Sequence, residues 1–483
     1  MADIATRPAG LRLRPSEHRT LLLIGDLIAS ILALVGAVYS WLGYSWYNLI
    51  ASGVSPEKAL RVFPNLKIPF WFYLMPIIWL MLLIELYDPH NASSRRRTLR
   101  GVAIAAFVGF VGYSLVFITN REPTSLPRIG VGSFLLLGSL LTLIWRFIYI
   151  RLYKTTGMTR RVLVVGAGKA GKTLVQVYKK LGTPPFRLIG FVDDDQNKIG
   201  QVVEDFPVLG ASNDLLRIVE SARISDVVVA IMGEMRGSTF QTILDIQESG
   251  IEVTRMPTIY EEMIGRVPIH HLESDWIIRS FVDEARANGF YELGKRFLDI
   301  LGGLLFGAFF LLVSPLIALS TLIDSGLPIL YTQKRLGKSG REFRIYKFRT
   351  MWQNAEADGQ ARLAVENDPR ITRVGRFLRK TRLDELPQFI NVLRGDMSLV
   401  GPRAERRELV EGFQKKIPFY RARLLVRPGL TGWAQINYGY AASVEDTVVK
   451  LEYDLYYIKH RNLSMDFSIL LRTVGTVLRS RGR

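Results

Sequence analysis

Five apolar stretches constrain the fold of this sequence more than any other feature. Each approaches the roughly 20 residues that a helix needs to cross the hydrocarbon core of a bilayer. Four of them lie in the first third of the chain, at about Thr20–Tyr44, Ile68–Leu86, Gly101–Thr119 and Gly130–Tyr149. Hydrophobic residues make up 48% of the chain, and its mean hydropathy is positive. The sequence therefore predicts four N-terminal transmembrane helices.

Lysine and arginine residues near the span ends predict the orientation. They are frequent at the N-terminus, at Arg95–Arg100 and from Arg151 onward, and sparser in the other connections. This bias places the N-terminus and everything after the fourth span in the cytoplasm. No small-residue cleavage site follows the first apolar run, so no signal peptide is expected. Asp26 and Glu85 lie within spans, and we expect each to pair with a nearby arginine at the membrane interface.

The fifth apolar segment differs because Ser314 and Pro315 interrupt it. Proline removes a helix hydrogen bond and bends the chain, and the serine hydroxyl can bond to the backbone groups that are freed. Basic residues flank both ends, at Lys295–Arg296 and Lys334–Arg335, which favours the same side of the membrane for both. We therefore predict a re-entrant helix over residues 296–323, with a kinked crossing as the alternative.

A soluble α/β module is predicted between these membrane segments. RVLVVGAGKAGKTL reads as a strand, a turn and a helix start, and Gly166, Gly168 and Gly171 fit G-x-G-x-x-G. Asp193 ends the next strand, 22 residues after Gly171. In dinucleotide-binding folds such glycines admit a pyrophosphate and such an acid holds a ribose. The same turn can pack a Rossmann-like module without a ligand, and the module has no Tyr-x-x-x-Lys pair suited to hydride chemistry.

The segment Arg376–Arg403, RFLRKTRLDELPQFINVLRGDMSLVGPR, carries the strongest chemical signal. Adjacent Asp384 and Glu385 lie among many arginines and lysines, and Pro387 ends any helix that begins at the two acids. Two acids among cations can form a salt-bridged corner of the structure. They can also be a nucleophile and a metal ligand in a pocket for phosphates, because arginine binds phosphate in a bidentate fork.

Composition excludes several other functions. The net charge is +19, yet the basic region after Tyr331 lacks the aromatic array of single-strand binders, so we expect anionic head groups and phosphorylated substrates, and no nucleic acid. The chain has no cysteine, which excludes disulfides and thiolate chemistry. The pair His270–His271 fits no metal motif. Residues Met465–Arg483 predict an amphipathic helix at the membrane interface, with a core helix as the alternative.

Four sequence blocks occur in the order of a known family. They are QKRLGKSGREFRIYKFRTM from Gln333, the segment around Asp384–Glu385, GDMSLVGPR from Gly395 and RPGLTGWAQIN from Arg427. On these blocks the chain resembles the bacterial sugar transferase family, the polyprenyl-phosphate hexose-1-phosphate transferases. Residues 1–286 resemble the front half of its larger members. The resemblance implies that the α/β module is accessory and that the Ser-Pro break belongs to a re-entrant helix.

The patterns and the resemblance together predict an α/β membrane protein in four parts. These are an N-terminal membrane domain over 1–155, a Rossmann-like accessory domain over 156–265, a linker over 266–290, and a small α/β catalytic domain with the re-entrant helix over 291–483. The catalytic domain is expected on the cytoplasmic face of the bacterial inner membrane. The spans and the accessory domain offer surface for a homodimer.

The resemblance also implies a reaction. Members of the family move a sugar-1-phosphate from a UDP-sugar to undecaprenyl phosphate. By resemblance, Asp384 is the nucleophile that forms an acyl phosphate, and Glu385 helps Asp384 to hold Mg²⁺. The residues expected by resemblance at the phosphates and the uridine are Lys347, Arg379, Pro402 and Arg403.

Such an enzyme would initiate the synthesis of an exopolysaccharide, a capsule or an O-antigen, and glucose is the favoured sugar. Three alternatives stay open. The first is a membrane-anchored sugar-nucleotide oxidoreductase or dehydratase that uses a nucleotide at Gly166–Gly171. The second is a non-enzymatic, nucleotide-sensing scaffold. The third is a transferase in which both acids hold metal and the lipid phosphate attacks directly.

Overall fold

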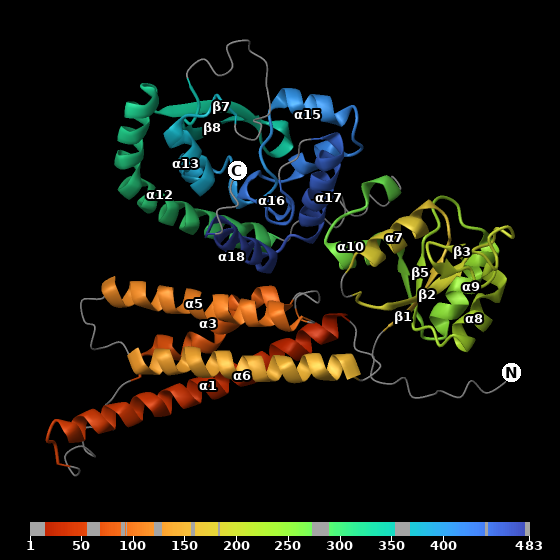
Figure 1. Ribbon diagram of the computed structural model, residues 1–483, viewed down its shortest axis with the longest axis horizontal. Coiled ribbons are helices and arrows are strands. Elements are labelled where there is room, and N and C mark those ends of the chain that lie inside the picture. Colours follow the sequence, from red (N-terminus) through yellow and green to blue (C-terminus); the bar gives the residue numbers. More distant parts are fainter. Residues whose placement is uncertain are drawn as a thin grey trace. The chain divides into compact units, whose positions relative to one another are not determined.

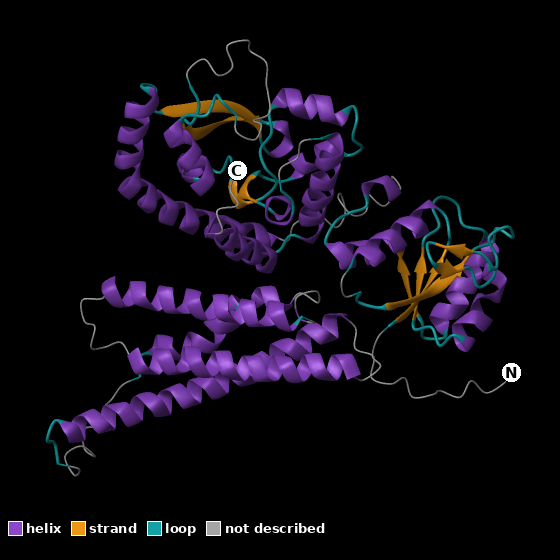
Figure 2. Ribbon diagram, in the orientation of Figure 1, coloured by secondary structure: helices purple, strands orange, loops and turns teal. Residues whose placement is uncertain are grey.

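The computed structural model of the chain describes ten stretches of residues: 15–55, 68–87, 92, 94–119, 128–155, 160–181, 184–272, 289–352, 368–439 and 443–478 (Figure 1). Helices form the N-terminal part, and strands occur only after it among these residues (Figure 2). We describe the N-terminal helices, the α/β module and the C-terminal α/β domain in turn.

Three long apolar helices form most of the N-terminal part. They are α1 (Pro15–Ala51), α5 (Arg95–Thr119) and α6 (Arg128–Thr155). Small residues allow α1 and α6 to approach closely. A Cβ atom at Gly25 would lie 2.0 Å from the Trp145 ring, and one at Gly36 would lie 2.7 Å from Leu137. Close packing over small residues is a common way for helices to associate in lipid.

The second predicted span is apolar and helical but shorter than predicted. It folds as the 3₁₀ helix η2 (Phe70–Leu74), α3 (Met75–Leu82) and the 3₁₀ helix η3 (Ile84–Tyr87). Pro76 lacks a backbone N–H, and it stands in the first turn of α3, where proline is tolerated. The chain therefore starts a new helix here. Of the described residues, the helices long and apolar enough to cross a membrane belong to α1, α5, α6 and α12.

A buried ion pair joins α1 to α6. Arg146 Nη2 lies 2.6 Å from Asp26 Oδ2, and neither side chain is exposed. Arg146 Nη1 also donates to the Leu86 carbonyl at 2.7 Å. The expected arginine partner of Asp26 thus exists, and the pair is buried inside the helical bundle. The side chain of Glu85 lies outside the described part of the structure.

The α/β module contains a four-stranded sheet in the order β2-β1-β5-β6. The strands are β1 (Arg161–Val165), β2 (Arg187–Val192), β5 (Asp226–Val229) and β6 (Glu252–Arg255). The helices are α7 (Lys169–Lys180), α8 (Leu215–Ser221), α9 (Gly237–Glu248) and α10 (Met256–Ile264). A small hairpin pairs β3 (Val202–Val203) with β4 (Phe206–Pro207), and 3₁₀ turns η5 and η6 span Ser212–Asp214 and Ile269–His271. The alternation of strands and helices agrees with a Rossmann-like module.

The C-terminal domain is built on two strand pairs. Strands β7 (Leu330–Leu336) and β8 (Glu342–Phe348) are antiparallel, and β9 (Ser398–Val400) and β10 (Gly429–Thr431) are parallel. Its helices after α12 are α13 (Arg373–Thr381), α14 (Phe389–Arg394), α15 (Arg407–Gln414), α16 (Trp433–Asn437), α17 (Val444–His460) and α18 (Leu463–Leu478). The 3₁₀ helices are η8 (Lys338–Gly340), η9 (Leu383–Gln388) and η10 (Tyr420–Leu425).

Two segments contribute to the core of the C-terminal domain. Ile469 of α18 is fully buried in this core, Phe467, Leu470 and Leu471 of the predicted apolar stripe are half-buried, and the side chains of Val474, Val477 and Leu478 lie outside the described part of the structure. Val267 and Ile269, from the predicted linker, are buried in the same core. The rest of that linker, from residue 273 to 288, lies outside the described residues.

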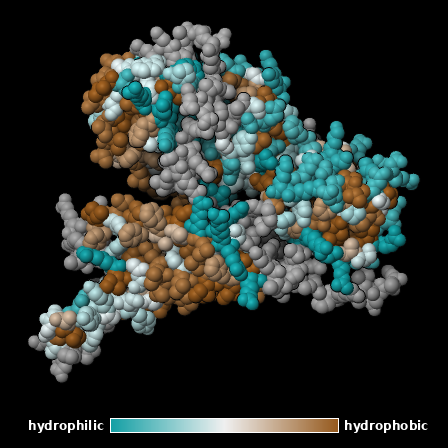
Figure 3. All heavy atoms as spheres, viewed as in Figure 1, coloured by the Kyte–Doolittle hydropathy of each residue, from teal (hydrophilic) through white to brown (hydrophobic). Residues whose placement is uncertain are grey.

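Helix α12 (Gly289–Ser325) has 37 residues with Pro315 inside it, and it changes direction part-way along (Figure 1). A straight α-helix of this length would span about 55 Å, and sharp bends in helices occur almost always at features such as proline. Hydrophobic side chains gather over α12, as they do over the N-terminal helices (Figure 3). Exposed apolar residues on it include Leu304, Leu311 and Leu316.

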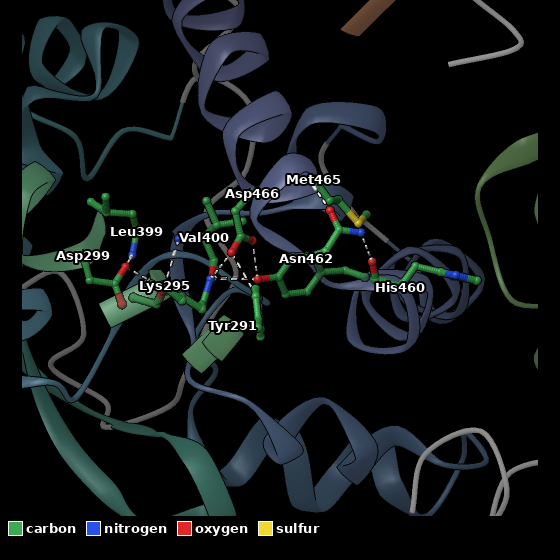
Figure 4. A network of polar contacts seen from close by, with 11 residues as sticks. Tyr291, Lys295, Asp299, Leu399, Val400, His460, Asn462, Met465 and Asp466 are labelled. Carbon is green, nitrogen blue, oxygen red and sulfur yellow. Dashed lines mark hydrogen bonds and ion pairs between the residues drawn. The ribbon is translucent and has the colours of Figure 1, made fainter. Parts of the chain in front are cut away.

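A polar network fastens the start of α12 to β9 and α18 (Figure 4). Lys295 Nζ lies 2.9 Å from Asp466 Oδ2 and donates to the Val400 carbonyl at 3.0 Å. Asp299 Oδ1 accepts from the Leu399 backbone N–H at 2.8 Å. Because β9 leads directly to Gly401–Arg403, this network links the position of α12 to that loop.

The far end of α12 contacts the same domain. Asp324 Oδ2 accepts from the Val374 backbone N–H at 3.1 Å, at the start of α13. Arg349, just after β8, donates to the Leu327 carbonyl at 3.0 Å. Both ends of α12 are therefore bonded to one C-terminal domain.

Candidate functional site

A sharp turn places Asp384 and Glu385 between two helices. Helix α13 ends at Arg382, whose φ of +58° lies in the left-handed region. The Arg382 backbone N–H donates to the Arg379 carbonyl at 3.3 Å, which closes α13. The chain then forms the short 3₁₀ helix η9, which contains both acids and Pro387. The acids thus lie on a tight turn whose ends α13 and α14 hold in place.

Glu385 is surrounded by cations. Its Oε1 accepts from Lys347 Nζ at 2.7 Å and from Arg403 Nη2 at 2.8 Å. Arg382 Nη1 lies 3.5 Å from Oε2. Burial would raise the pKa of Glu385, but these positive charges hold it well below its usual value. Glu385 therefore stays ionised at neutral pH and holds three basic side chains together.

Asp384 lies beside these cations without a partner of its own. It is 8% exposed, and it accepts no hydrogen bond and forms no ion pair with the residues that the structure describes. Burial, and then the negative charge of Glu385, raise the pKa of Asp384 to about 6, although Lys347, Arg379 and Arg403 lower it. A buried carboxylate that is free of hydrogen bonds and close to cations is suited to attack the phosphorus of an anionic phosphate group.

Arg379 comes from the last turn of α13. Its Nε donates to Thr350 Oγ1 at 2.9 Å, and its Nη groups make no hydrogen bond with a described residue. The pKa of Arg379 is lowered from its usual value, because burial lowers it by more than the charge of Asp384 raises it. The guanidinium is thus fixed on one side while the other retains donors for a ligand.

Pro402 and Arg403 lie on a loop whose glycines allow two backbones to touch. The Pro402 carbonyl accepts from the Gly429 backbone N–H at 2.9 Å. A Cβ atom at Gly401 would lie 2.4 Å from the Arg427 carbonyl oxygen, so only glycine fits there. The loop that carries Arg403 is therefore rigidly joined to the start of β10.

Two residues to which the sequence assigned no role contact Arg403. Gln435 Oε1 lies 3.5 Å from Arg403 Nη1, and Arg423 Nη2 donates to the Arg403 carbonyl at 3.2 Å. Arg423 is held in turn by Asp454 at 2.9 Å. Gln435 belongs to the RPGLTGWAQIN block, and its membership of that block was a signal from which it could have been predicted as a site residue. No local pattern connects Arg423 with a loop 20 residues away.

The predicted residues therefore separate into three locations. Those that surround one another at the turn are Asp384, Glu385, Lys347, Arg379 and Arg403, with Pro402 in the adjoining loop. Ser314 and Pro315 lie within α12. The glycines and Asp193 belong to the α/β module.

The residues at the turn fit a Mg²⁺ ion that also binds substrate phosphate. Within the described residues, no group of three or more His, Cys, Asp or Glu side chains is placed to hold a metal. Mg²⁺ commonly uses one or two carboxylates and takes its other ligands from water and substrate phosphates. Asp384 and Oε2 of Glu385 meet this smaller requirement, because Lys347 and Arg403 contact Oε1, and the nearest cation to Oε2 that the structure describes, Arg382, lies 3.5 Å away.

A cleft of about 530 Å³ lies in the α/β module at the predicted nucleotide position, and Gly166, Gly168 and Asp193 line it. Gly171 instead packs α7 against β1, since a Cβ atom there would lie 2.1 Å from the Gly166 carbonyl oxygen. Asp193 Oδ2 accepts from the Ala167 backbone N–H at 2.7 Å. This acid thus holds the glycine turn in place.

Two family profiles match the chain. Residues 290–480 match the bacterial sugar transferase profile, and residues 83–249 match that of a CoA-binding domain. The first match contains the acidic turn, and the second contains the glycine turn.

Curated proteins match as well. The chain is 45% identical over 232 residues to a UDP-N-acetylgalactosamine-undecaprenyl-phosphate N-acetylgalactosaminephosphotransferase of Aeromonas hydrophila, covering 47% of this chain and 52% of that protein. It is 32% identical over 320 residues to the UDP-glucose:undecaprenyl-phosphate glucose-1-phosphate transferase of Escherichia coli (strain K12), covering 65% and 67%. It is 30% identical over 344 residues to a UDP-galactose-lipid carrier transferase of Erwinia amylovora, covering 67% and 69%.

The apolar helices indicate a membrane-associated protein, and its C-terminal domain carries a carboxylate among cations. The chain spans about half the length of the Aeromonas relative and about two thirds of the other two. The chain belongs to the bacterial sugar transferase family. By their names, these relatives are transferases that act on different sugars.

Proposed function

We propose that this protein transfers hexose-1-phosphate from a UDP-sugar to undecaprenyl phosphate, and so initiates the synthesis of a surface polysaccharide. The observation that carries the proposal is Asp384: a buried carboxylate surrounded by Lys347, Arg379 and Arg403, without a bonded partner among the residues that the structure describes. A purely structural carboxylate at this place would be expected to form an ion pair, as Glu385 does.

The first step is attack by an Asp384 oxygen on the phosphorus that bears the sugar. A bond forms between the carboxylate oxygen and phosphorus, and the bond from phosphorus to the UMP oxygen breaks. The electron pair leaves with UMP, and an acyl phosphate remains on Asp384. Arg379 and Arg403 bind the phosphate oxygens and stabilise their charge. Lys347 keeps Glu385 in place and adds positive charge.

The second step is attack by an undecaprenyl phosphate oxygen on the same phosphorus. The bond to Asp384 breaks, the carboxylate is regenerated, and undecaprenyl-diphosphate-sugar is released. The bond between the sugar's anomeric carbon and its oxygen is never broken, so the anomeric configuration is retained. Two steps also allow the soluble donor and the lipid acceptor to react at one site in turn.

Asp384 and Glu385 are the residues that would hold Mg²⁺, and the ion would supply charge neutralisation for the donor diphosphate. The protein prepares the site by keeping Glu385 ionised among its cations. Reaction without added divalent cation, in the presence of a chelator, would contradict this part of the proposal.

We propose that α12 is re-entrant. Both of its ends are bonded to the same C-terminal domain, through Lys295 and Asp299 at one end and Asp324 at the other. A straight crossing would separate those ends by the thickness of the bilayer. A bend at Ser314–Pro315 returns the helix to the inner leaflet, where the cytoplasmic catalytic domain meets its lipid acceptor.

The proposed donor sugar is glucose, and the accompanying localisation is the bacterial inner membrane. UDP-N-acetylgalactosamine and UDP-galactose are the competitors, since they are named for relatives of this chain. The N-terminal helices and the α/β module leave surface for a homodimer.

UMP release from UDP-glucose, UDP-galactose and UDP-N-acetylgalactosamine tests the proposal. The full-length protein in nanodiscs is assayed with and without undecaprenyl phosphate and Mg²⁺, beside Asp384→Asn and Glu408→Gln. Glu408 is an exposed acid on α15, so its variant controls for the loss of one carboxylate. We expect repeated turnover only with lipid and metal, none with Asp384→Asn, and normal turnover with Glu408→Gln.

Absence of UMP with every donor, from protein that elutes as a single folded species, would refute the transferase proposal. Turnover by Asp384→Asn would refute the covalent step but not the reaction class. Mass spectrometry of the protein after a single turnover, with the lipid omitted, should detect a sugar-phosphate adduct on Asp384.

A further inference from the structure

The cleft in the α/β module has the size and the lining of a ligand site. Its volume of about 530 Å³ falls within the range of about 300–1,000 Å³ that is typical of small-molecule pockets. Ile231, Met232 and Met235 give it an apolar wall, and Lys169 and Arg236 add positive charge. An apolar wall beside cations suits a molecule that has a ring at one end and phosphate at the other.

Several features point to phosphate at the charged end. Helices α7 and α9 both begin at the cleft, and their first backbone N–H groups form the positive ends of the helix dipoles. A Cβ atom at Gly168 would meet nothing within 4 Å, so the backbone is open to a ligand there. Asp193 and Asp194 line the cleft too, but Asp193 Oδ2 accepts from the Ala167 backbone N–H at 2.7 Å and Asp194 Oδ1 accepts from the Ser212 backbone N–H at 2.8 Å. Glu234 is an exposed acid on the rim.

The segment that closes one side of the cleft also belongs to the C-terminal domain. His270 and His271 line the cleft, and His271 Nε2 lies 3.0 Å from Thr173 Oγ1 on α7. Val267 and Ile269, a few residues earlier, are buried in the core of the C-terminal domain. Residues 261–271, here called the connecting segment, therefore reach from the cleft into the catalytic fold.

The connecting segment is bonded to α16 and α17 along its length. Glu261 Oε2 lies 3.0 Å from Lys459 Nζ and 2.7 Å from His460 Nε2. Trp433 Nε1, at the start of α16, donates to the Gly265 carbonyl at 2.9 Å. Burial and ion pairing of this kind make the connection stiff, because a packed core transmits small displacements rather than absorbing them.

From α16 a short chain of contacts leads to the acidic turn. Gln435 lies two residues after Trp433, and its Oε1 faces Arg403 Nη1 at 3.5 Å. Arg403 in turn donates to Glu385 at 2.8 Å. A displacement of α16 therefore alters the position of an arginine that the proposed mechanism places on the donor phosphate.

We propose that the α/β cleft binds a nucleoside diphosphate and that its occupancy changes the transferase site through the connecting segment. The phosphates bind at Gly168, Lys169 and Arg236, and the base lies against the apolar wall. Coupling between two sites is reciprocal in binding free energy, so donor binding must alter nucleotide affinity by the same factor. Nucleotide binding in the cleft does not depend on the proposed transferase activity, whereas the coupling between the two sites rests on it.

Calorimetric titration of ADP, GDP, CDP and UDP into the full-length protein in nanodiscs tests the binding half. Lys169 and Lys172 are both exposed on α7, but only Lys169 lines the cleft, so the two form a matched pair. We expect at least one nucleotide to bind at one site, with affinity reduced at least tenfold by Lys169→Glu and unchanged by Lys172→Glu. No binding that depends on Lys169, for any of the four, would overturn the inference.

UMP release with and without the nucleotide that binds tests the coupling half. We expect saturation of the cleft to change the KM for the UDP-sugar at least threefold. Trp433→Phe keeps an aromatic side chain but removes the indole N–H that bonds to Gly265, and it should retain nucleotide binding while losing that response. Trp352→Phe, a change at an exposed tryptophan of the same domain, should keep the response.

The failures of the two proposals are distinguishable. Nucleotide binding with no UMP release under any condition would refute the transferase proposal and leave the binding half standing. Transferase activity that is identical with and without bound nucleotide would overturn the coupling. A response that survives in Trp433→Phe and in Glu261→Gln alike would overturn the role of the connecting segment.

Discussion

The rate of the first chemical step should rise about tenfold between pH 5 and pH 7. In the proposed mechanism Asp384 must be ionised to attack phosphorus, and its pKa is raised to about 6 by burial and by the charge of Glu385. About one tenth of the carboxyl groups are then ionised at pH 5 and about nine tenths at pH 7. An aspartate with an ordinary pKa near 3.9 would be almost fully ionised at both, and the rate would change by about 10% or less.

A single-turnover assay of UMP release without the lipid acceptor isolates this step. The phosphate of the acceptor also titrates near neutral pH, and omitting it removes that contribution. Glu385→Gln provides a second arm, since it removes the negative charge that helps to raise the pKa of Asp384. The midpoint should therefore move to lower pH in this variant, whatever its effect on the absolute rate. Glu408→Gln should leave the midpoint unchanged.

Two results would refute this reasoning. A rate that stays constant from pH 5 to pH 7 would mean that the attacking group is not a carboxyl with a raised pKa. A midpoint that stays in place or rises in Glu385→Gln would mean that Glu385 does not act on Asp384 through its charge.

Three further outcomes concern stability, each measured by thermal unfolding in detergent. Gly401→Ala should destabilise the protein by about 1–3 kcal/mol because its Cβ has no room, whereas Gly412→Ala, with open space, should not. Asp26→Asn should cost about 3–5 kcal/mol by leaving Arg146 buried and unpaired, and replacing both by leucine and methionine should recover most of it. Burial raises the pKa of Glu452 to about 7, so the folded state holds a proton that the unfolded chain releases between pH 4.5 and 7. The free energy of unfolding should therefore fall as pH rises through this window, by up to about 3 kcal/mol. Glu452→Gln should abolish that fall.

The acidic turn was predictable from local sequence. Asp384, Glu385 and Arg379 lie within seven positions of one another, and Pro387 limits how the chain can continue. The glycine turn of the α/β module was also predictable, because the spacing of small residues there follows directly from the close approach of a helix to a strand. The roles of these residues stay predictions.

Other features depend on contacts that no local pattern records. Arg146 stands 120 residues from Asp26, and nothing near either residue identifies the other as its partner. The sequence around Pro76 is as apolar as a full span, but the missing N–H divides it into short helices. The sequence of α18 leaves its surroundings open, because a stripe of apolar residues can face a core as readily as a lipid surface.

The network at the start of α12 has a consequence for how the protein is made. Lys295 and Asp466 lie 171 residues apart. At about 5–20 residues per second, a ribosome needs roughly 10–35 s to synthesise the second after the first. The ion pair between Lys295 and Asp466 therefore cannot form until α18 has been made. A chain that stalls before α18 would leave Lys295 without this carboxylate, although Asp299 could already accept its bond from Leu399 of β9.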